Sequence, residues 1–201
     1  MAINLANNSS LANITALPAS ITGGGLTLVS SQTASASASL EFSMDSTYDS
    51  YVFKFIDINP ATNDVDFTFN LSTDSGSNYN VTKTTTYVWT YHNESDAAAE
   101  IVYETGSDLA QSTGFQKLAR RIGSGADESN VGNLQIFNPS SSTYVKHFIG
   151  DVTGYYAQPG AISSHRNLMA GYGNTTSPVT NIKFQMSSGN FDGIIKMYGV
   201  A

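Results

Sequence analysis

The chain has 201 residues, which is enough for one domain with a buried core. It contains no cysteine, so disulfides, thiolate metal sites and cysteine nucleophiles are excluded. The formal net charge is −7, charged residues make up only 12%, and the nine basic residues are scattered apart from the adjacent Arg120 and Arg121. Because no continuous basic track is present, nucleic acid is not an expected partner.

The first 25 residues differ in character from the rest of the chain. They are rich in Asn, Ser and Ala, end in three glycines, and carry apolar residues spaced too widely for a core of their own. We predict that residues 1–25 form an extended arm that anchors the protein to a partner, with a frayed terminus as the alternative. The candidate anchoring residues are Ile3, Leu5, Leu11, Ile14 and Leu17. The segment has neither a basic leader nor an apolar run of about 7 to 15 residues, so we expect assembly in a cytoplasm without membrane insertion.

The stretch TASASASLEFS, residues 33–43, alternates strictly between two kinds of side chain. Ser, Thr and Glu fall on one parity, and the other parity holds Ala34, Ala36, Ala38, Leu40 and Phe42. This pattern predicts one half-buried strand with alanines on its inner side. Because small side chains permit close approach, the strand is a candidate subunit contact, and a shallow sheet edge is the alternative.

Period-two alternation recurs along the chain and predicts further strands. It is clearest in YVFKF, residues 51–55, and in residues 64–71, where Val65, Phe67 and Phe69 share one face. Other runs are rich in Val, Ile, Thr and aromatic residues and are bounded by turn-forming residues: LTLVS, VTKTTTYVWTY, VGNLQIF, TYVKHFIGDV, VTNIKFQM and GIIKMYGV.

These signals predict roughly eight or nine strands. Helical patterns are confined to residues 95–104 and 108–121, either of which is compatible with one short helix in a crossover. Many short strands with some long connections predict an all-β, antiparallel two-sheet sandwich of jelly-roll type. The expected organisation is an arm at residues 1–25 followed by a β-sandwich domain at residues 26–201.

The strong catalytic and nucleotide-binding motifs do not occur in this sequence. There is no HExxH, GxSxG, GxxxxGK[ST] or strand-associated GxGxxG. The three histidines, His92, His147 and His165, each lie on a different predicted segment, and none has a second histidine at ligand spacing. We therefore expect no catalytic residue, no cofactor and no metal ion, and we do not expect an enzyme.

One polar cluster, TYHNESD at residues 90–96, brings His92, Glu94 and Asp96 to the end of an aromatic strand. A proton donor and carboxylates near Trp89 and Tyr91 are compatible with an enzyme site. A strand end that enters a polar loop collects such residues anyway, and we prefer this explanation.

A second polar cluster surrounds the turns NPATND and TDSGSN, which separate predicted strands. Its candidate calcium ligands are Asn63, Asp64, Asp66 and Asp74. We expect Asp64 and Asp66 on a solvent-facing strand surface, so solvated turns are the preferred explanation.

Aromatic residues give the clearest indication of a ligand-binding surface. The chain has eleven tyrosines and one tryptophan, whose apolar faces and polar tips suit carbohydrate or protein surfaces. Strand alternation explains most of them as core or core-edge residues. The loop GYYAQPG, residues 154–160, is the preferred candidate for ligand contact. The candidate contact residues are Trp89, Tyr91, His92, Tyr155, Tyr156 and Gln158.

Several segments resemble structural proteins of tailed bacteriophages of marine bacteria, particularly those that infect cyanobacteria. These segments are NNSSLANITALPASITGGGLTLVSSQTAS, DSTYDSYVFKF, STDSGSNYNVTKTTT, FNPSS followed by YVKHFI, and the closing MSSGNFDGIIKMYGV. The resemblance runs nearly end to end, and its motifs are turn and strand signatures rather than catalytic ones. It implies a virion component that is present in several copies, with no catalytic positions to carry over.

Residues and resemblance together leave three function classes, in order of preference. The first is a tail fibre or fibre tip that is anchored by the arm and contacts a host-surface glycan or receptor. The second is a capsid decoration protein, and the third is a polysaccharide depolymerase, which only the TYHNESD cluster supports. The expected partners are other virion proteins and further copies of the chain, as a homotrimer by analogy with β modules on threefold axes.

Overall fold

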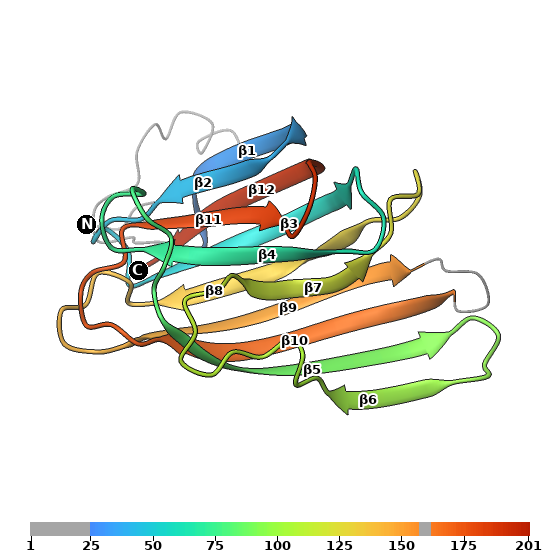
Figure 1. The fold of residues 1–201 in the computed structure, drawn as a ribbon. Coiled ribbons are helices and arrows are strands. Elements are labelled where there is room, and N and C mark those ends of the chain that lie inside the picture. The colour runs from blue at the N-terminus through green and yellow to red at the C-terminus, as the bar shows by residue number, and fades with distance from the viewer. Residues whose placement is uncertain (1–24, 157–161) are drawn as a thin grey trace, which may run out of the picture.

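The computed structural model describes residues 25–156 and 162–201, and these residues form two antiparallel sheets without a helix. The large sheet contains, in spatial order, β1 (Thr27–Ser37), β12 (Phe191–Val200), β3 (Ser50–Pro60), β8 (Asn130–Phe137), β9 (Lys146–Tyr156), β10 (Ser163–Gly173), β5 (Lys83–Asn93) and β6 (Ala99–Tyr103). The small sheet contains β2 (Ser39–Ser43), β11 (Asn181–Met186), β4 (Val65–Ser72) and β7 (Gln116–Ile122) (Figure 1). The prediction of an all-β two-sheet sandwich is confirmed, with more strands than the eight or nine expected.

Four strand pairs tie the first part of the chain to the last. β1 pairs with β12, β2 with β11, β3 with β8, and β4 with β7, and these pairs alternate between the large and the small sheet. Two further hairpins, β5–β6 and β9–β10, are inserted into this arrangement. They lie side by side and widen the large sheet by the strands β9, β10, β5 and β6, which we call the extension. In Figure 1, β5 and β6 lie beyond the edge of the small sheet.

The core lies between the two sheets and is built mainly from phenylalanine. Phe184 of β11 sits at its centre, with ring centroids 5.2 to 6.0 Å from those of Phe42, Phe53, Phe55 and Phe67. All five side chains are buried. Edge-to-face contacts between rings add to the free energy gained by removing them from water. The predicted inner faces of residues 51–55 and 64–71 are confirmed.

The prediction of a single alanine-faced strand at residues 33–43 is wrong. The chain crosses from the edge of the large sheet to the edge of the small sheet between β1 and β2. Just before this crossing, in a bulge of β1, Ala36 adopts φ 48° and its N–H donates to Asp192 Oδ1 at 2.7 Å. Ala34 is buried, whereas Ala36 and Ala38 are exposed, so no continuous alanine face exists. Both pieces are edge strands, as the alternative interpretation expected.

The short helix considered for residues 95–104 or 108–121 does not form, because both segments contain strands. Residues 99–103 form β6, which pairs with β5, and residues 116–122 form β7, which pairs with β4. Sheet pairing and burial outweigh the weak helical preference of such short segments. None of the described residues belongs to a helix that is long and apolar enough to cross a membrane. The predicted anchoring residues Ile3, Leu5, Leu11, Ile14 and Leu17 lie outside the described residues.

Candidate functional site

Strand alternation separates the predicted ligand-contact residues onto two faces of the extension. We call the face toward the small sheet the inner face. Trp89, Tyr91 and Tyr156 line a pocket on it, and His92 and Tyr155 line a different pocket on the outer face. Successive side chains of a strand point to opposite faces, so neighbours in the sequence are separated by the sheet. The sixth predicted residue, Gln158, lies outside the described residues.

The inner face carries a cluster of stacked rings from β5, β9 and β10. Trp89 stacks on Tyr91 with centroids 4.6 Å apart, and Tyr156 stacks on His165 at 4.7 Å. The edge of one ring in the Trp89–His165 pair meets the face of the other at 5.1 Å, so the two stacks are joined. Pairing of His165 with Tyr91 across β10 and β5 brings these residues together. Sequence spacing alone does not reveal this neighbourhood.

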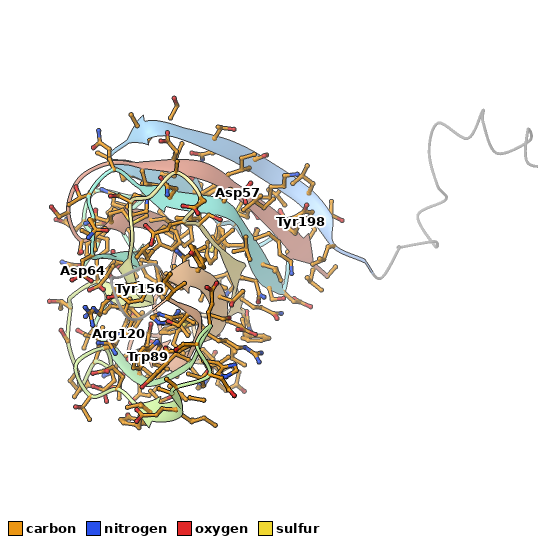
Figure 2. All side chains as sticks on the ribbon, turned by 90° about the vertical axis from the view of Figure 1, so that its right-hand side faces the viewer. Asp57, Asp64, Trp89, Arg120, Tyr156 and Tyr198 are labelled. Atoms are coloured by element: carbon orange, nitrogen blue, oxygen red, sulfur yellow. The ribbon has the colours of Figure 1, made fainter. Side chains whose placement is uncertain are left out.

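These rings surround a cavity of about 250 Å³, which we call the aromatic pocket. It is lined by Trp89, Tyr91, Asn93, Arg121, Tyr156, Ser163 and His165. Figure 2 shows Trp89, Arg120 and Tyr156 close together near Asp64, well away from Tyr198. The residues that line the aromatic pocket come from the end of β5, the end of β9, the start of β10 and, through Arg121, from β7.

Two consecutive arginines of β7 cover the rings. The Arg120 guanidinium lies 4.7 Å from the Trp89 ring centroid, and that of Arg121 lies 5.5 Å from the Tyr156 ring centroid. Consecutive residues of a regular strand face opposite ways, but here the register shifts between β4 and β7, and Arg121 has φ 54°. This bulge lets both arginines reach the aromatic pocket.

Both arginines are held by carboxylates. Arg120 forms an ion pair with Glu104, and Arg121 Nε donates to Asp64 Oδ1 at 3.0 Å. This hydrogen bond to Asp64 is also the main cause that raises the pKa of Arg121. The positive charges beside the rings are therefore already compensated.

His165 is the most deeply buried ionisable group of the aromatic pocket, with 5% of its surface exposed. Burial lowers its pKa from 6.5 to about 4, and the positive charges of Arg120 and Arg121 act in the same direction. The imidazole is therefore neutral at neutral pH. A neutral imidazole has one donor and one acceptor nitrogen and packs well between rings.

Two buried polar atoms of the aromatic pocket lack hydrogen bonds. Within residues 25–156 and 162–201, Trp89 Nε1 and Asn93 Oδ1 have no partner. The indole N–H is only a donor, and the amide oxygen is only an acceptor. A buried polar atom without a partner costs free energy, so such atoms are uncommon in folded proteins.

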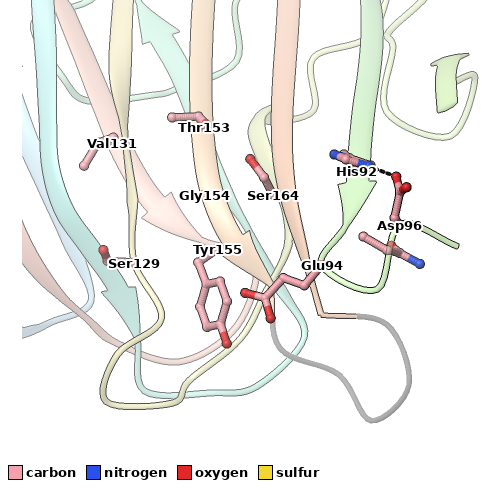
Figure 3. Close-up of a pocket in the computed structure, with 10 residues that line it drawn as sticks. His92, Glu94, Asp96, Ser129, Val131, Thr153, Gly154, Tyr155 and Ser164 are labelled. Atoms are coloured by element: carbon pink, nitrogen blue, oxygen red, sulfur yellow. Dashed lines mark hydrogen bonds and ion pairs between the residues drawn. The ribbon is translucent and has the colours of Figure 1, made fainter. Parts of the chain in front are cut away.

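The outer face holds a wider hollow of about 510 Å³ at the same end of the extension. His92 Nε2 lies 2.9 Å from Asp96 Oδ1, and both side chains are largely exposed. In Figure 3 the side chain of Glu94 extends toward the Tyr155 ring. Of the two rings expected near His92, Trp89 lines the aromatic pocket on the opposite face, whereas Tyr91 and His92 both border a further hollow.

The predicted calcium ligands do not converge. Asp64 is bound to Arg121, and Asp66 is bound to Lys117 Nζ at 3.0 Å. Asp74 lies in the turn beyond the other end of β4, where hydrogen bonds from Ser72 and Asn78 lower its pKa to about 2. Across the described residues, no group of three His, Cys, Asp or Glu side chains could hold a metal ion.

Sequence reasoning missed five residues of this site: Asn93, Arg120, Arg121, Ser163 and His165. Arg120 and Arg121 stood out only as adjacent basic residues. Their position over the rings depends on the bulge in β7, and that of His165 depends on the pairing of β10 with β5. Neither feature has a local signature in the sequence.

No protein-family model matches the chain, and no curated protein matches it.

Proposed function

We propose that the chain is a structural protein of a tailed-bacteriophage virion, acting as a tail fibre or fibre tip that contacts the host surface. The observation that carries the proposal is the aromatic pocket, which offers stacked rings and unpaired polar atoms at one end of the molecule. The resemblance to phage structural proteins supports a place in the virion, which is assembled in the host cytoplasm.

The position of the start of β1 supports an anchored module with the pocket at its far end. Thr27 pairs with Gly199 at the start of β1, and the pocket lies where β5 ends and β10 begins, at the opposite end of the sandwich (Figure 1). The apolar residues Leu26, Leu28 and Val29 are exposed beside this start. Exposed apolar side chains on an edge strand suit a contact with another protein. In the proposal, the anchor at residues 1–25 therefore joins the sandwich at the end opposite the pocket.

The proposal also assigns the sandwich to the jelly-roll type, with two inserted hairpins. The pairs β1–β12, β2–β11, β3–β8 and β4–β7 follow the path of one long hairpin that is rolled into two sheets. The hairpins β5–β6 and β9–β10 are additional to this path and supply most of the pocket lining. The pocket thus belongs to the part of the chain that the jelly roll does not need.

A capsid decoration protein is the second candidate, because an anchored edge strand would serve equally well on a capsid shell. The two candidates differ in copy number, which quantitative mass spectrometry of purified particles measures against the major capsid protein. Symmetry sets the copy number on the order of hundreds for decoration and roughly tens or fewer for a fibre. A fibre-like number supports the proposal, whereas near-parity with the capsid protein overturns it in favour of decoration.

The proposal includes no catalysis, and it takes the protein to be a homotrimer. The segment 33–43 supplies no alanine face for trimer contacts, so the trimer rests on analogy alone.

Incubation with host surface polysaccharide should release no reducing ends. Release that disappears in His92→Ala would favour the depolymerase alternative. Sedimentation equilibrium measures the oligomeric state directly.

A further inference from the structure

We infer that the aromatic pocket binds one neutral sugar residue through its hydroxyl groups and ring face. This inference deepens the proposed function, since it names the chemical class of the host-surface ligand. Three independent features of the pocket carry it: the unpaired polar atoms, the compensated charges and the size of the cavity.

The unpaired polar atoms match a ligand whose groups both accept and donate hydrogen bonds. Trp89 Nε1 offers a proton and Asn93 Oδ1 accepts one, and both atoms are buried without a partner among the described residues. A hydroxyl group accepts one hydrogen bond and donates another, so hydroxyl groups satisfy both kinds of atom. A carboxylate can only accept, and an ammonium group can only donate. The donor and acceptor pair therefore favours a polyol over either ion.

The charges around the pocket favour a neutral ligand. Arg120 is paired with Glu104, and Arg121 is paired with Asp64. An anionic ligand would have to compete with these carboxylates for the same guanidinium groups. His165 stays neutral at neutral pH and adds no positive charge. A neutral ring with hydroxyl groups can bind without displacing Glu104 or Asp64 from the arginines.

The shape of the pocket fits a single ring. Its volume of about 250 Å³ lies below the range of roughly 300 to 1,000 Å³ that is usual for drug-sized ligands. Tyr91 stacks on Trp89 with centroids 4.6 Å apart, and His165 meets Tyr91 edge to face at 6.1 Å. The polarised C–H groups of a sugar ring pack well on such a surface.

The test uses Trp89, which is the only tryptophan of the chain, as a built-in reporter. The full chain is titrated with glucose, galactose, mannose, N-acetylglucosamine and glucuronic acid, each as the methyl glycoside. Trp89 emission and saturation-transfer NMR of the sugar protons are recorded. We expect a saturable emission change and transfer to the ring protons for at least one neutral sugar.

Two variants and one control locate the binding. Tyr91→Ala removes the stacking surface and should weaken binding about tenfold, in line with the worth of an aromatic contact. Asn93→Ala removes the unpaired acceptor and should also weaken binding. Tyr155→Ala changes the outer face of the same sheet and should leave binding unchanged.

Three results would overturn the inference: no response to any sugar of the panel, a response to glucuronic acid alone, or equal binding by Tyr91→Ala and the wild-type chain. The first two results come from the wild-type chain alone, so they test the inference even where a variant does not fold. A protein of fibre-like copy number that binds no sugar contradicts this inference alone. A sugar-binding protein with decoration-like copy number contradicts the proposed function alone.

Discussion

Two aromatic regions of this protein arise from the same strand alternation, but one forms the buried core and the other lines a pocket. In the core, Phe184 and its neighbours are hydrocarbon rings sealed between two sheets. In the aromatic pocket, Trp89, Tyr91 and Tyr156 carry polar atoms and lie where the small sheet ends at β7. The width of the covering sheet decides whether an aromatic sheet face becomes core or remains accessible.

The largest expected difference between the regions is in stability. Phe184→Ala removes the ring that contacts Phe42, Phe53, Phe55 and Phe67, and it should lower the free energy of unfolding by about 3 to 5 kcal/mol. Tyr91→Ala, at the margin of the sandwich, should cost far less. Denaturant unfolding with a constant slope measures both. Equal losses of unfolding free energy would show that the pocket rings stabilise the fold as much as the core rings do.

A smaller effect is expected from His165 on acidification. Its folded pKa of about 4 lies below the unfolded value of 6.5, so between these values the unfolded chain binds more protons. The stability it contributes is complete above pH 6.5 and is lost as the pH falls toward 4. The loss is about 3 kcal/mol, at about 1.4 kcal/mol per pKa unit.

The contribution of His165 is separated from that of the carboxylates by comparison with His165→Phe, which keeps a ring against Tyr156. Unfolding free energies of both proteins are measured between pH 4 and pH 7. The wild-type chain should lose more stability on acidification than the variant. Parallel curves would mean that His165 is solvated rather than buried.

The smallest expected effect is that of Arg120, which links the pocket rings to Glu104. Arg120→Met removes one cation over Trp89 and should cost about 1 to 2 kcal/mol of stability, the scale of a partly buried cation–π contact. Because Arg120 helps lower the pKa of His165, the variant should also raise that pKa. NMR titration of the imidazole protons checks the shift. An unchanged pKa would mean that Arg120 does not contribute, which leaves burial and Arg121 as its causes.

The core was predictable from the sequence, and the pocket was predictable only in part. Alternation in residues 51–55 and 64–71 identifies the buried faces, because period two is a local property of a strand. The same rule, applied to Trp89, Tyr91 and His92, would have separated His92 from the rings. The candidate set instead followed closeness in the sequence, which strands do not translate into closeness in space.

The remaining errors arise where non-local pairing decides the structure. Residues 33–43 have the pattern of one strand because the bulge at Ala36 depends on a positive φ and on a hydrogen bond to Asp192, far away in the sequence. The segment 116–122 carries a helical pattern but pairs with β4. The bulge in this strand places Arg121 beside Tyr156, and no local sequence pattern predicts this bulge.

Competition for phage adsorption tests the central claim most directly, namely that the protein contacts the host through the aromatic pocket. Purified wild-type protein, Tyr91→Ala and Tyr155→Ala are each added in excess to host cells before the phage. The account predicts that the wild-type protein and Tyr155→Ala slow adsorption while Tyr91→Ala does not. Adsorption that is unaffected by all three proteins, or slowed equally by all three, would contradict it.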